Sequence, residues 1–206
     1  ELTLGFAING VIDEARILRK GGLRPGDAII LTKPLGTGAL FAADMQYRAR
    51  SHWIAAALQS MLQSNGPAAR ILLDANANAC TDITGFGLAG HLGELAQASN
   101  VSIILQGETL PVLEGAHEVM REGIFSSLHG QNEANALRYF DPTQHSGARR
   151  YPVLFDPQTS GGLAAGVAAD RAKACVRALR EKHCASSVII GTVAARSSAD
   201  PHLRLE

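Results

Sequence analysis

The sequence lacks an excess of charge, a signal-peptide pattern and a long apolar run, and each absence removes a class of protein. Among 206 residues, 19 are basic and 19 are acidic, with no tract of either sign. We therefore expect neither nucleic acid nor an anionic membrane as a partner. The longest apolar runs, such as residues 54–58, are far too short to cross a bilayer. The chain opens with Glu1 and shows no leader pattern, so we expect a piece cut from something longer.

The sequence also lacks a cysteine framework. Cys80, Cys175 and Cys184 show no CxxC spacing, which fits a reducing cytoplasm better than a set of disulfides. We expect Cys175 in the core on a helix face. Cys80 is read as a small buried hydrophobe in preference to a reactive thiol. The seven histidines are scattered without HxH or HExxH spacing, so a zinc site is not expected.

What is present is an alternation of strand-like and helix-like segments. The expected strands are 4–12, 17–18, 28–32, 101–105, 151–155, 162–167 and 187–193. Strands 17–18 and 28–32 are expected to pair around a turn at 24–27. The expected helices cover 54–62, 68–75, 88–96, a stretch from Pro111 that ends before Gly123, and 172–179. Residues 125–150 are expected to be a long irregular connection with one or two helical turns within 133–139. The pattern predicts an α/β (α+β) fold, a mixed sheet covered by helices.

Two short segments combine a carboxylate, hydroxyls and glycines at predicted junctions between elements. The first motif segment is 79–87, ACTDITGFG, and the second is 156–162, DPQTSGG. Such junctions leave backbone N–H groups free for an anion, and a carboxylate there can hold a hard cation. Together the two segments suggest part of an ATP-phosphate and magnesium site.

The first motif segment allows two interpretations from its residues alone. Asp82 or Thr84 could be the N-cap of the helix that follows. Alternatively, Asp82 could be a magnesium ligand, with further ligands supplied from elsewhere because Mg²⁺ combines few carboxylates with phosphates and waters. Gly85 and Gly87 would let the backbone approach a phosphate or would simply permit tight packing.

The second motif segment is equally open. It is either a turn that links two strands or a wall of a nucleotide or anion pocket. Gln158, Thr159 and Ser160 supply hydrogen-bonding groups, and Gly161 and Gly162 allow unusual backbone conformations. A third stretch, 33–38, lacks the GxxxxGK[ST] order and is therefore not a Walker A motif. Its Thr37 and Gly38 could bind an anion at a helix start, although a plain strand-to-helix turn is favoured.

Three stretches carry a family resemblance. Residues 31–38 (LTKPLGTG), 81–92 (TDITGFGLAGHL) and 156–163 (DPQTSGGL) resemble selenophosphate synthetase, also called selenide, water dikinase, in the family's order and at similar spacing. The resemblance extends from about residue 4 to residue 193. The DPQTSGG stretch alone would indicate only the wider superfamily, which includes aminoimidazole ribonucleotide synthetase, thiamine-phosphate kinase and a hydrogenase maturation protein.

The resemblance implies a two-domain enzyme that converts ATP, selenide and water to selenophosphate, AMP and phosphate. The chain, 1–206, resembles the carboxy-terminal domain alone, with an α/β sandwich around a mixed sheet. In that family the nucleophilic Cys or selenocysteine, a catalytic Lys and most metal-binding aspartates lie in the amino-terminal domain, which also makes most of the homodimer contacts. None of that domain is in this sequence, so we assign no catalytic residue and expect the chain alone to fold but to lack kinase activity.

The resemblance matches Asp82 to the family's metal aspartate in this half and implies Mg²⁺. From their own chemistry, Thr81, Thr84, Thr159, Ser160, Gly161 and Gly162 are the cofactor-binding candidates. Two alternatives stay open. One is a related ATP enzyme of the aminoimidazole ribonucleotide synthetase or thiamine-phosphate kinase type. The other is a non-catalytic domain that reuses this fold.

Overall fold

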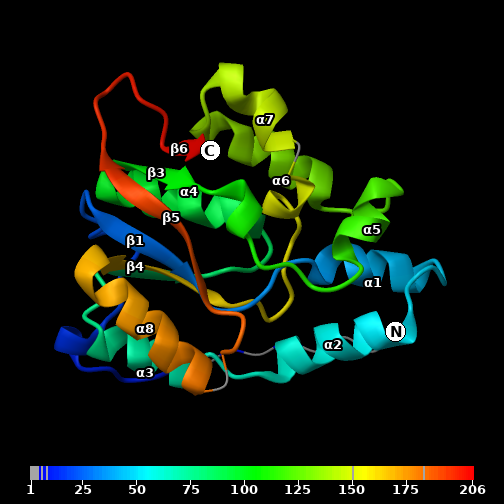
Figure 1. The fold of residues 1–206 in the computed structure, drawn as a ribbon, viewed down its shortest axis with the longest axis horizontal. Helices are drawn as coiled ribbons and strands as arrows, with labels where there is room; N and C mark the ends of the chain where they lie inside the picture. Colours follow the sequence, from blue (N-terminus) through cyan, green and yellow to red (C-terminus); the bar gives the residue numbers. More distant parts are fainter. Residues whose placement is uncertain (1–4, 6, 8, 150, 183) are drawn as a thin grey trace.

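The sheet organises the molecule (Figure 1). The computed structural model describes residues 5, 7, 9–149, 151–182 and 184–206. A six-stranded sheet has the order β2-β4-β1-β5-β3-β6. Its strands are β1 (Asp27–Leu31), β2 (Ala79–Asp82), β3 (Val101–Leu105), β4 (Leu163–Ala168), β5 (Val188–Ala195) and β6 (Leu203–Leu205). Neighbours are antiparallel except β3 and β6. The predicted mixed sheet is therefore confirmed.

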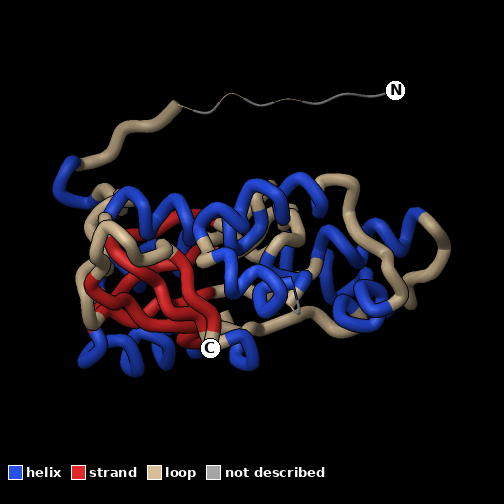
Figure 2. The backbone as a smooth tube through the Cα atoms, turned by 90° about the horizontal axis from the view of Figure 1, so that it is seen from above, coloured by secondary structure: helices blue, strands red, loops and turns tan. Residues whose placement is uncertain are grey.

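Helices cover both faces of the sheet, and Figure 2 shows the strands between two helical layers. The α-helices are α1 (Thr37–Met45), α2 (Ser51–Leu62), α3 (Gly66–Asp74), α4 (Gly87–Ser99), α5 (Ala116–Arg121), α6 (His129–Ala136), α7 (His145–Arg149) and α8 (Ala169–Glu181). Short 3-10 helices are η1 (Glu14–Arg16), η2 (Gly107–Thr109), η3 (Leu137–Tyr139), η4 (Pro142–Gln144) and η5 (Pro152–Leu154). Among the described residues, no helix is long and apolar enough to cross a membrane.

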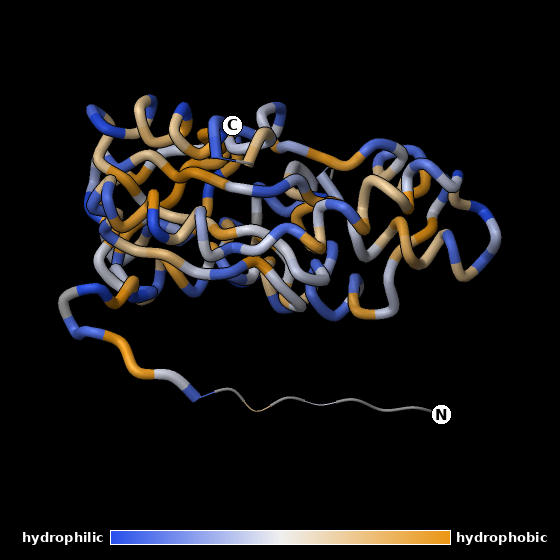
Figure 3. The backbone as a smooth tube through the Cα atoms, turned by 90° about the horizontal axis from the view of Figure 1, so that it is seen from below, coloured by the Kyte–Doolittle hydropathy of each residue, from blue (hydrophilic) through white to orange (hydrophobic). Residues whose placement is uncertain are grey.

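Strand alternation explains the two layers. Successive side chains of a strand point to opposite faces. Along β1, Ala28 and Ile30 join a hydrophobic cluster with α3 and α8, whereas Ile29 and Leu31 join the larger cluster with α1, α4 and α5. Every residue of β1 is buried, as expected for a strand covered on both faces. Figure 3, coloured by the hydropathy of each residue, shows hydrophobic stretches along the inner segments and hydrophilic residues mostly on the outer helices and loops.

The expected strand pair 17–18 with 28–32 is wrong. The turn at 24–27 is present, and its Asp27 backbone N–H donates to the Arg24 carbonyl at 3.0 Å. However, residues 17–18 are irregular, and β1 pairs with β4 and β5. Both edges of β1 are thus occupied by longer apolar strands. The expected strand 4–12 is also absent at its described residues 5, 7 and 9–12, and its other residues lie outside the described part.

Three further expectations change because tertiary contacts override local pattern. Residues 151–155 form η5 instead of a strand, since Pro152 favours the start of a helical turn. The stretch after Pro111 runs beside Leu35, which donates its N–H to the Pro111 carbonyl at 2.9 Å, so α5 begins only at Ala116. Residues 125–149 hold α6, η3, η4 and α7, more helix than predicted. Strands β2 and β6 were not anticipated.

Candidate functional site

The two motif segments meet at one end of the sheet. Strands β2 and β4 are antiparallel, with Asp82 opposite Leu163, so the end of β2 lies beside the start of β4. Beyond the strands, Ile83 donates its backbone N–H to Gly162 at 2.8 Å. The Gln158 backbone N–H donates to the Thr84 carbonyl at 3.0 Å. Two segments that are far apart in the sequence thus form one continuous surface.

Asp82 is the exposed last residue of β2. Its carboxylate makes no hydrogen bond or ion pair to any residue in the described part of the chain. Helix α4 begins at Gly87, after an N-cap residue, Phe86, that makes no side-chain capping bond. The alternative that Asp82 or Thr84 caps this helix is therefore wrong.

The donor set at this end of the sheet is incomplete for a metal. Among the described residues, no group of three or more His, Cys, Asp or Glu side chains could hold an ion. A single unpartnered carboxylate nevertheless fits Mg²⁺, which binds one or two carboxylates together with nucleotide phosphates and waters. Asp82 can thus supply one ligand, and phosphates or another part of a longer protein would supply the others.

A buried histidine holds the turn after Asp82. The Thr84 backbone N–H donates to His91 Nε2 at 3.0 Å, and the Thr84 hydroxyl lies 3.2 Å from the same nitrogen. Burial lowers the pKa of His91, which favours the neutral ring that this bond requires. Thr81 is buried, and its hydroxyl donates to the Asp82 carbonyl at 3.3 Å. Sequence reasoning missed His91, although its place three residues after Leu88 on α4 was a signal for an inward side chain.

The second motif segment turns its polar side chains inward, onto the start of α1. Gln158 Oε1 accepts hydrogen bonds from the Gly36 N–H at 3.0 Å, the Thr37 N–H at 3.3 Å and the Thr37 hydroxyl at 3.1 Å. Asp156 Oδ2 accepts one from the Gly38 N–H at 3.0 Å. These amides are the unpaired donors of a helix N-terminus. They are satisfied from within the chain, so Thr37 and Gly38 do not offer a free anion site.

Asp156 is the most deeply buried carboxylate of the site. It is 0% exposed, and its Oδ1 atom has no hydrogen-bond partner in the described chain. Burial raises its pKa to about 7, opposed by the hydrogen bonds from Gln158 and Gly38. The sequence drew attention to the carboxylate and to Gln158 of this segment, but neither Asp156 nor Gln158 was among the predicted cofactor-binding or metal residues. The Asp-Pro-Gln order gave no hint that both side chains would fold back onto α1.

The remaining candidates of the second motif segment divide into two kinds. Thr159 and Ser160 are exposed at the surface. The Thr159 N–H donates to the Thr37 hydroxyl at 3.0 Å, and the Ser160 hydroxyl donates to the Met61 carbonyl at 2.8 Å. In contrast, Gly161 is buried, and a Cβ atom there would lie 2.1 Å from the Ile83 carbonyl oxygen.

Gly162 is packed in the same way. A Cβ atom there would lie 2.6 Å from the Lys33 backbone nitrogen. Beneath the loop, the buried Lys33 side chain donates to the Ser160 carbonyl at 2.8 Å, and burial lowers its pKa. The lack of side chains at Gly161 and Gly162 therefore allows the loop to lie directly on the first motif segment and on the end of β1.

A groove of about 610 Å³ lies beside these segments. Its walls come from α1, the first motif segment, the second motif segment and the residues before α6. They include Thr37, Phe41, Gly85, Phe125, Ser127 and Thr159. The volume is within the range of small-molecule and cofactor sites. Asp82 is not one of the lining residues, so the groove and the unpartnered carboxylate are separate features of one surface.

The cysteines play no part in this surface. Cys80, Cys175 and Cys184 are all buried and free. Burial raises the pKa of Cys80 to about 12, and the Asp82 charge adds to the effect. A thiol with such a pKa carries almost no thiolate near neutral pH. Cys80 is therefore the buried hydrophobe that the sequence favoured.

The fold and this surface define an α/β domain that presents a glycine-rich loop and one free carboxylate at the end of a mixed sheet. Residues 24–203 match the family described as "AIR synthase related protein, C-terminal domain". The chain belongs to this family.

Several relatives that match most of the chain carry the name "Selenide, water dikinase". A "Selenide, water dikinase" of Geobacter metallireducens is 37% identical over 163 residues, 79% of this chain and 47% of the relative. Another, of Caldanaerobacter subterraneus subsp. tengcongensis, is 32% identical over 200 residues, 97% of this chain and 58% of the relative. The chain thus spans about half the length of these relatives.

Solved structures agree on the fold. The hydrogenase maturation protein HypE matches with a TM-score of 0.68 and 21% identity, over 95% of this chain and 53% of HypE. HypE in complex with ATP matches with a TM-score of 0.66 and 21% identity, over 92% of this chain and 50% of that one. Thiamine-monophosphate kinase from Stenotrophomonas maltophilia K279a matches with a TM-score of 0.60 and 20% identity, over 95% of this chain and 54% of the kinase.

Proposed function

We propose that this chain is the carboxy-terminal ATP and magnesium domain of a selenide, water dikinase. The complete enzyme would convert ATP, selenide and water to selenophosphate, AMP and phosphate. One observation carries the proposal: relatives with this name are 32–39% identical to the chain. The convergence of the two motif segments into one surface supports it, because the residues that carry the family resemblance are the ones that meet.

Asp82 would bind Mg²⁺ in this enzyme. Phosphoryl transfer depends on charge neutralisation and positioning more than on covalent chemistry by the protein. Asp82 is exposed and unpartnered within the described chain, so its charge is available to a metal that bridges phosphates. The amino-terminal half of the complete protein would supply the remaining carboxylates, the nucleophile and the catalytic lysine.

The nucleotide would lie along the surface formed by both motif segments. Thr84, Thr159 and Ser160 would contribute hydroxyl or backbone groups, whereas the buried Thr81 would act by its hydrogen bond to the Asp82 carbonyl. Thr159 is exposed on the groove wall and is the best placed of them to contact a ligand directly. Gly161 and Gly162 would act by keeping the loop close to the first motif segment. The partners of the complete enzyme would be ATP, selenide and a second copy of itself, in the cytoplasm.

The test begins with the coding sequence directly upstream of residue 1. We expect a glycine-rich segment with a Cys or selenocysteine and a following Lys, then an Asp-rich domain. The complete protein should form AMP from ATP only when selenide is present. Turnover of thiamine phosphate or of a purine precursor in place of selenide would contradict the proposal, and so would an unrelated upstream domain.

The 206-residue chain alone should fold without this activity. At the surface of the motif segments, the described residues provide one unpartnered carboxylate, that of Asp82, whereas phosphoryl transfer needs several metal ligands. The measurement is selenide-dependent AMP formation by the purified chain, with circular dichroism to verify that it is folded. Activity at the level of the complete protein would show that the missing half is unnecessary and would contradict the two-domain account.

A further inference from the structure

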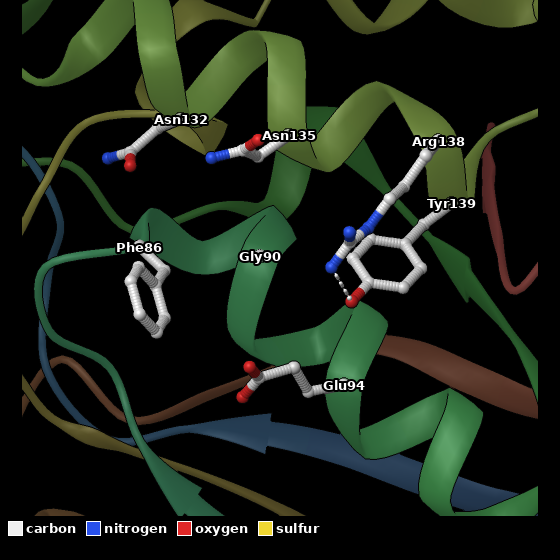
Figure 4. Close-up of a pocket in the computed structure, with 7 residues that line it drawn as sticks. All are labelled: Phe86, Gly90, Glu94, Asn132, Asn135, Arg138 and Tyr139. Carbon is white, nitrogen blue, oxygen red and sulfur yellow. Dashed lines mark hydrogen bonds between the residues drawn. The ribbon is translucent and has the colours of Figure 1, made fainter.

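A second, smaller pocket lies between α4 and α6 with η3, next to the first motif segment, whose Phe86 lines it (Figure 4). Its volume is about 190 Å³, equal to about six water molecules at roughly 30 Å³ each. Phe86 and Glu94 line it from the α4 side, and Asn132, Asn135, Arg138 and Tyr139 from the other. This volume is too small for a nucleotide, and the pocket shares no lining residue with the groove.

The cationic side of the pocket is fixed in place. An Arg138 Nη atom donates to the Tyr139 hydroxyl at 2.9 Å, and the guanidinium lies 4.8 Å from the centroid of the same ring. The ring in turn packs on Gly93, where a Cβ atom would lie 2.1 Å from it. Arg138 thus keeps further N–H donors in a planar array of fixed orientation. Such an array matches the two oxygens of a carboxylate.

The opposite side offers acceptors. Glu94 bonds Lys20 through Oε2 at 2.6 Å, which leaves Oε1 without a bond to the described residues. Asn132 is 5% exposed, and its Nδ2 donates to the Gly85 carbonyl at 2.8 Å and to the Phe155 carbonyl at 3.0 Å. These two acceptors fix the amide orientation, so the Asn132 oxygen is left as an acceptor. Carboxylate and amide oxygens together suit an ammonium group.

We propose that this pocket binds a small zwitterion of the α-amino acid class. Its carboxylate would pair with Arg138 and the Asn135 amide, and its ammonium with Glu94 and Asn132. Phe86, 59% exposed at the pocket, would cover the side chain. A simple anion fits less well because it would leave the oxygens of Glu94 and Asn132 without a donor, and a simple cation would meet Arg138. The presence of both charges in so small a volume selects a ligand that carries both.

Asn132 connects this pocket to the surface of the motif segments. Gly85 belongs to the first motif segment, and Phe155 directly precedes the second. Because one amide group binds both carbonyls, a ligand that contacts Asn132 should also change the surroundings of these two backbone positions. This effect gives the proposal a readout that does not depend on catalysis.

The experiment is an amide NMR titration of the ¹⁵N-labelled chain with L-alanine. We expect saturable shifts at the Asn132 and Asn135 side-chain amides and at the Phe86 and Asp156 backbone amides, whose peptide groups contain the two carbonyls that Asn132 binds. Propionate and ethylamine, which each carry one of the two charges, should bind at least about tenfold more weakly. Arg138→Gln and Glu94→Gln should each weaken L-alanine binding by about tenfold or more.

Two control variants match these substitutions. Arg50 also lies 4.8 Å over an aromatic ring, that of Trp53, and Glu122 also makes a 2.6 Å ion pair, with Arg48. Arg50→Gln and Glu122→Gln should leave the affinity unchanged. If Arg138→Gln does not fold, Glu94→Gln is decisive alone, because its ion pair with Lys20 is partly exposed.

Three results would overturn the proposal. The first is the absence of saturable shifts at the pocket with L-alanine. The second is propionate that binds as tightly as L-alanine, which would make the pocket a plain anion site. The third is an equal loss of affinity in the pocket variants and their controls.

Discussion

The two motif segments have similar compositions and opposite roles in the structure. Each contains one aspartate, hydroxyl residues and glycines. In the first, Asp82 is exposed and has no partner in the described chain. In the second, Asp156 is fully buried, and together with Gln158 it binds the start of α1. The difference shows that residue type identifies a candidate, whereas burial and partners decide whether its charge is available to a ligand.

The largest effect should come from the glycines. Gly161→Ala would place a methyl group 2.1 Å from the Ile83 carbonyl oxygen, whereas a Cβ atom at Gly85 meets nothing within 4 Å. We expect Gly161→Ala to lower the free energy of unfolding by about 3 kcal/mol or more, through overpacking. Gly85→Ala should stay within about 0.5 kcal/mol. Urea denaturation measures both, and equal effects would remove the asymmetry between the segments.

The next effect should come from the amide that caps α1. Gln158→Ala leaves the Gly36 and Thr37 donors without the acceptor that they now share. An unsatisfied buried donor costs roughly 1–3 kcal/mol, so we expect a loss of about 2–3 kcal/mol. Gln59→Ala, at an exposed position of α2, is the matched control and should cost less than about 0.5 kcal/mol. If Gln158→Ala leaves the free energy of unfolding unchanged, the second motif segment does not anchor α1.

Asp156 should make stability depend on pH. Burial raises its pKa to about 7 in the folded chain, above the ordinary unfolded value of about 3.9. The folded state therefore binds the proton more tightly, and the resulting stabilisation is complete below about pH 4 and is lost as the pH rises through about 7. Between pH 5 and pH 7, we expect the free energy of unfolding of the chain to fall by roughly 2 kcal/mol relative to that of Asp156→Asn.

The Asp156→Asn variant separates this effect from those of the histidines. Burial lowers the pKa of His91 and of His129, so their contribution has the opposite sign and is lost as the pH falls below about 6.5. The difference between the chain and Asp156→Asn cancels this contribution. Denaturation at several pH values makes the measurement. If the free energy of unfolding of the chain, relative to that of Asp156→Asn, rises with pH, then Asp156 is ionised and stabilised in the fold.

The smallest effect on stability should come from Asp82→Asn. The Asp82 side chain makes no bond to the described residues and is exposed, so the free energy of unfolding should change by less than about 0.5 kcal/mol. Thermal and urea denaturation measure it. A loss of 2 kcal/mol or so would point to a structural partner and would weaken the metal assignment.

Much of the sheet could be predicted from local pattern, and the exceptions have physical causes. Helix α4 follows from the spacing of Leu88, Leu92 and Leu95, all fully buried. The pairing of residues 17–18 could not be excluded from sequence, because nothing local shows that β1 already has two neighbours. Pro111 predicted a helix start, but its backbone bonds Leu35 instead. A local sequence pattern reports the preference of its residues for helix or strand, and contacts between residues distant in the sequence can override that preference.

The site was predicted in its composition but not in its orientation. The shared composition of the two motif segments suggested that they form one surface, and the structure brings them together by the bonds of Ile83 and Gln158. It did not indicate that Gly161 and Gly162 would pack against protein backbone, or that His91 would hold Thr84. These roles depend on the relative positions of β2, β4 and α4, which no local pattern contains.

The most direct test of the account is the magnesium dependence of selenide-dependent AMP formation by the complete protein. Asp82→Asn should be compared with Asp74→Asn, an exposed aspartate at the end of α3. The account predicts that Asp82→Asn is folded and loses turnover by about a hundredfold or more, or needs far more Mg²⁺, consistent with loss of a group that stabilises developing charge. Asp74→Asn should behave as the unaltered protein does. Unchanged magnesium dependence in Asp82→Asn would contradict the central claim.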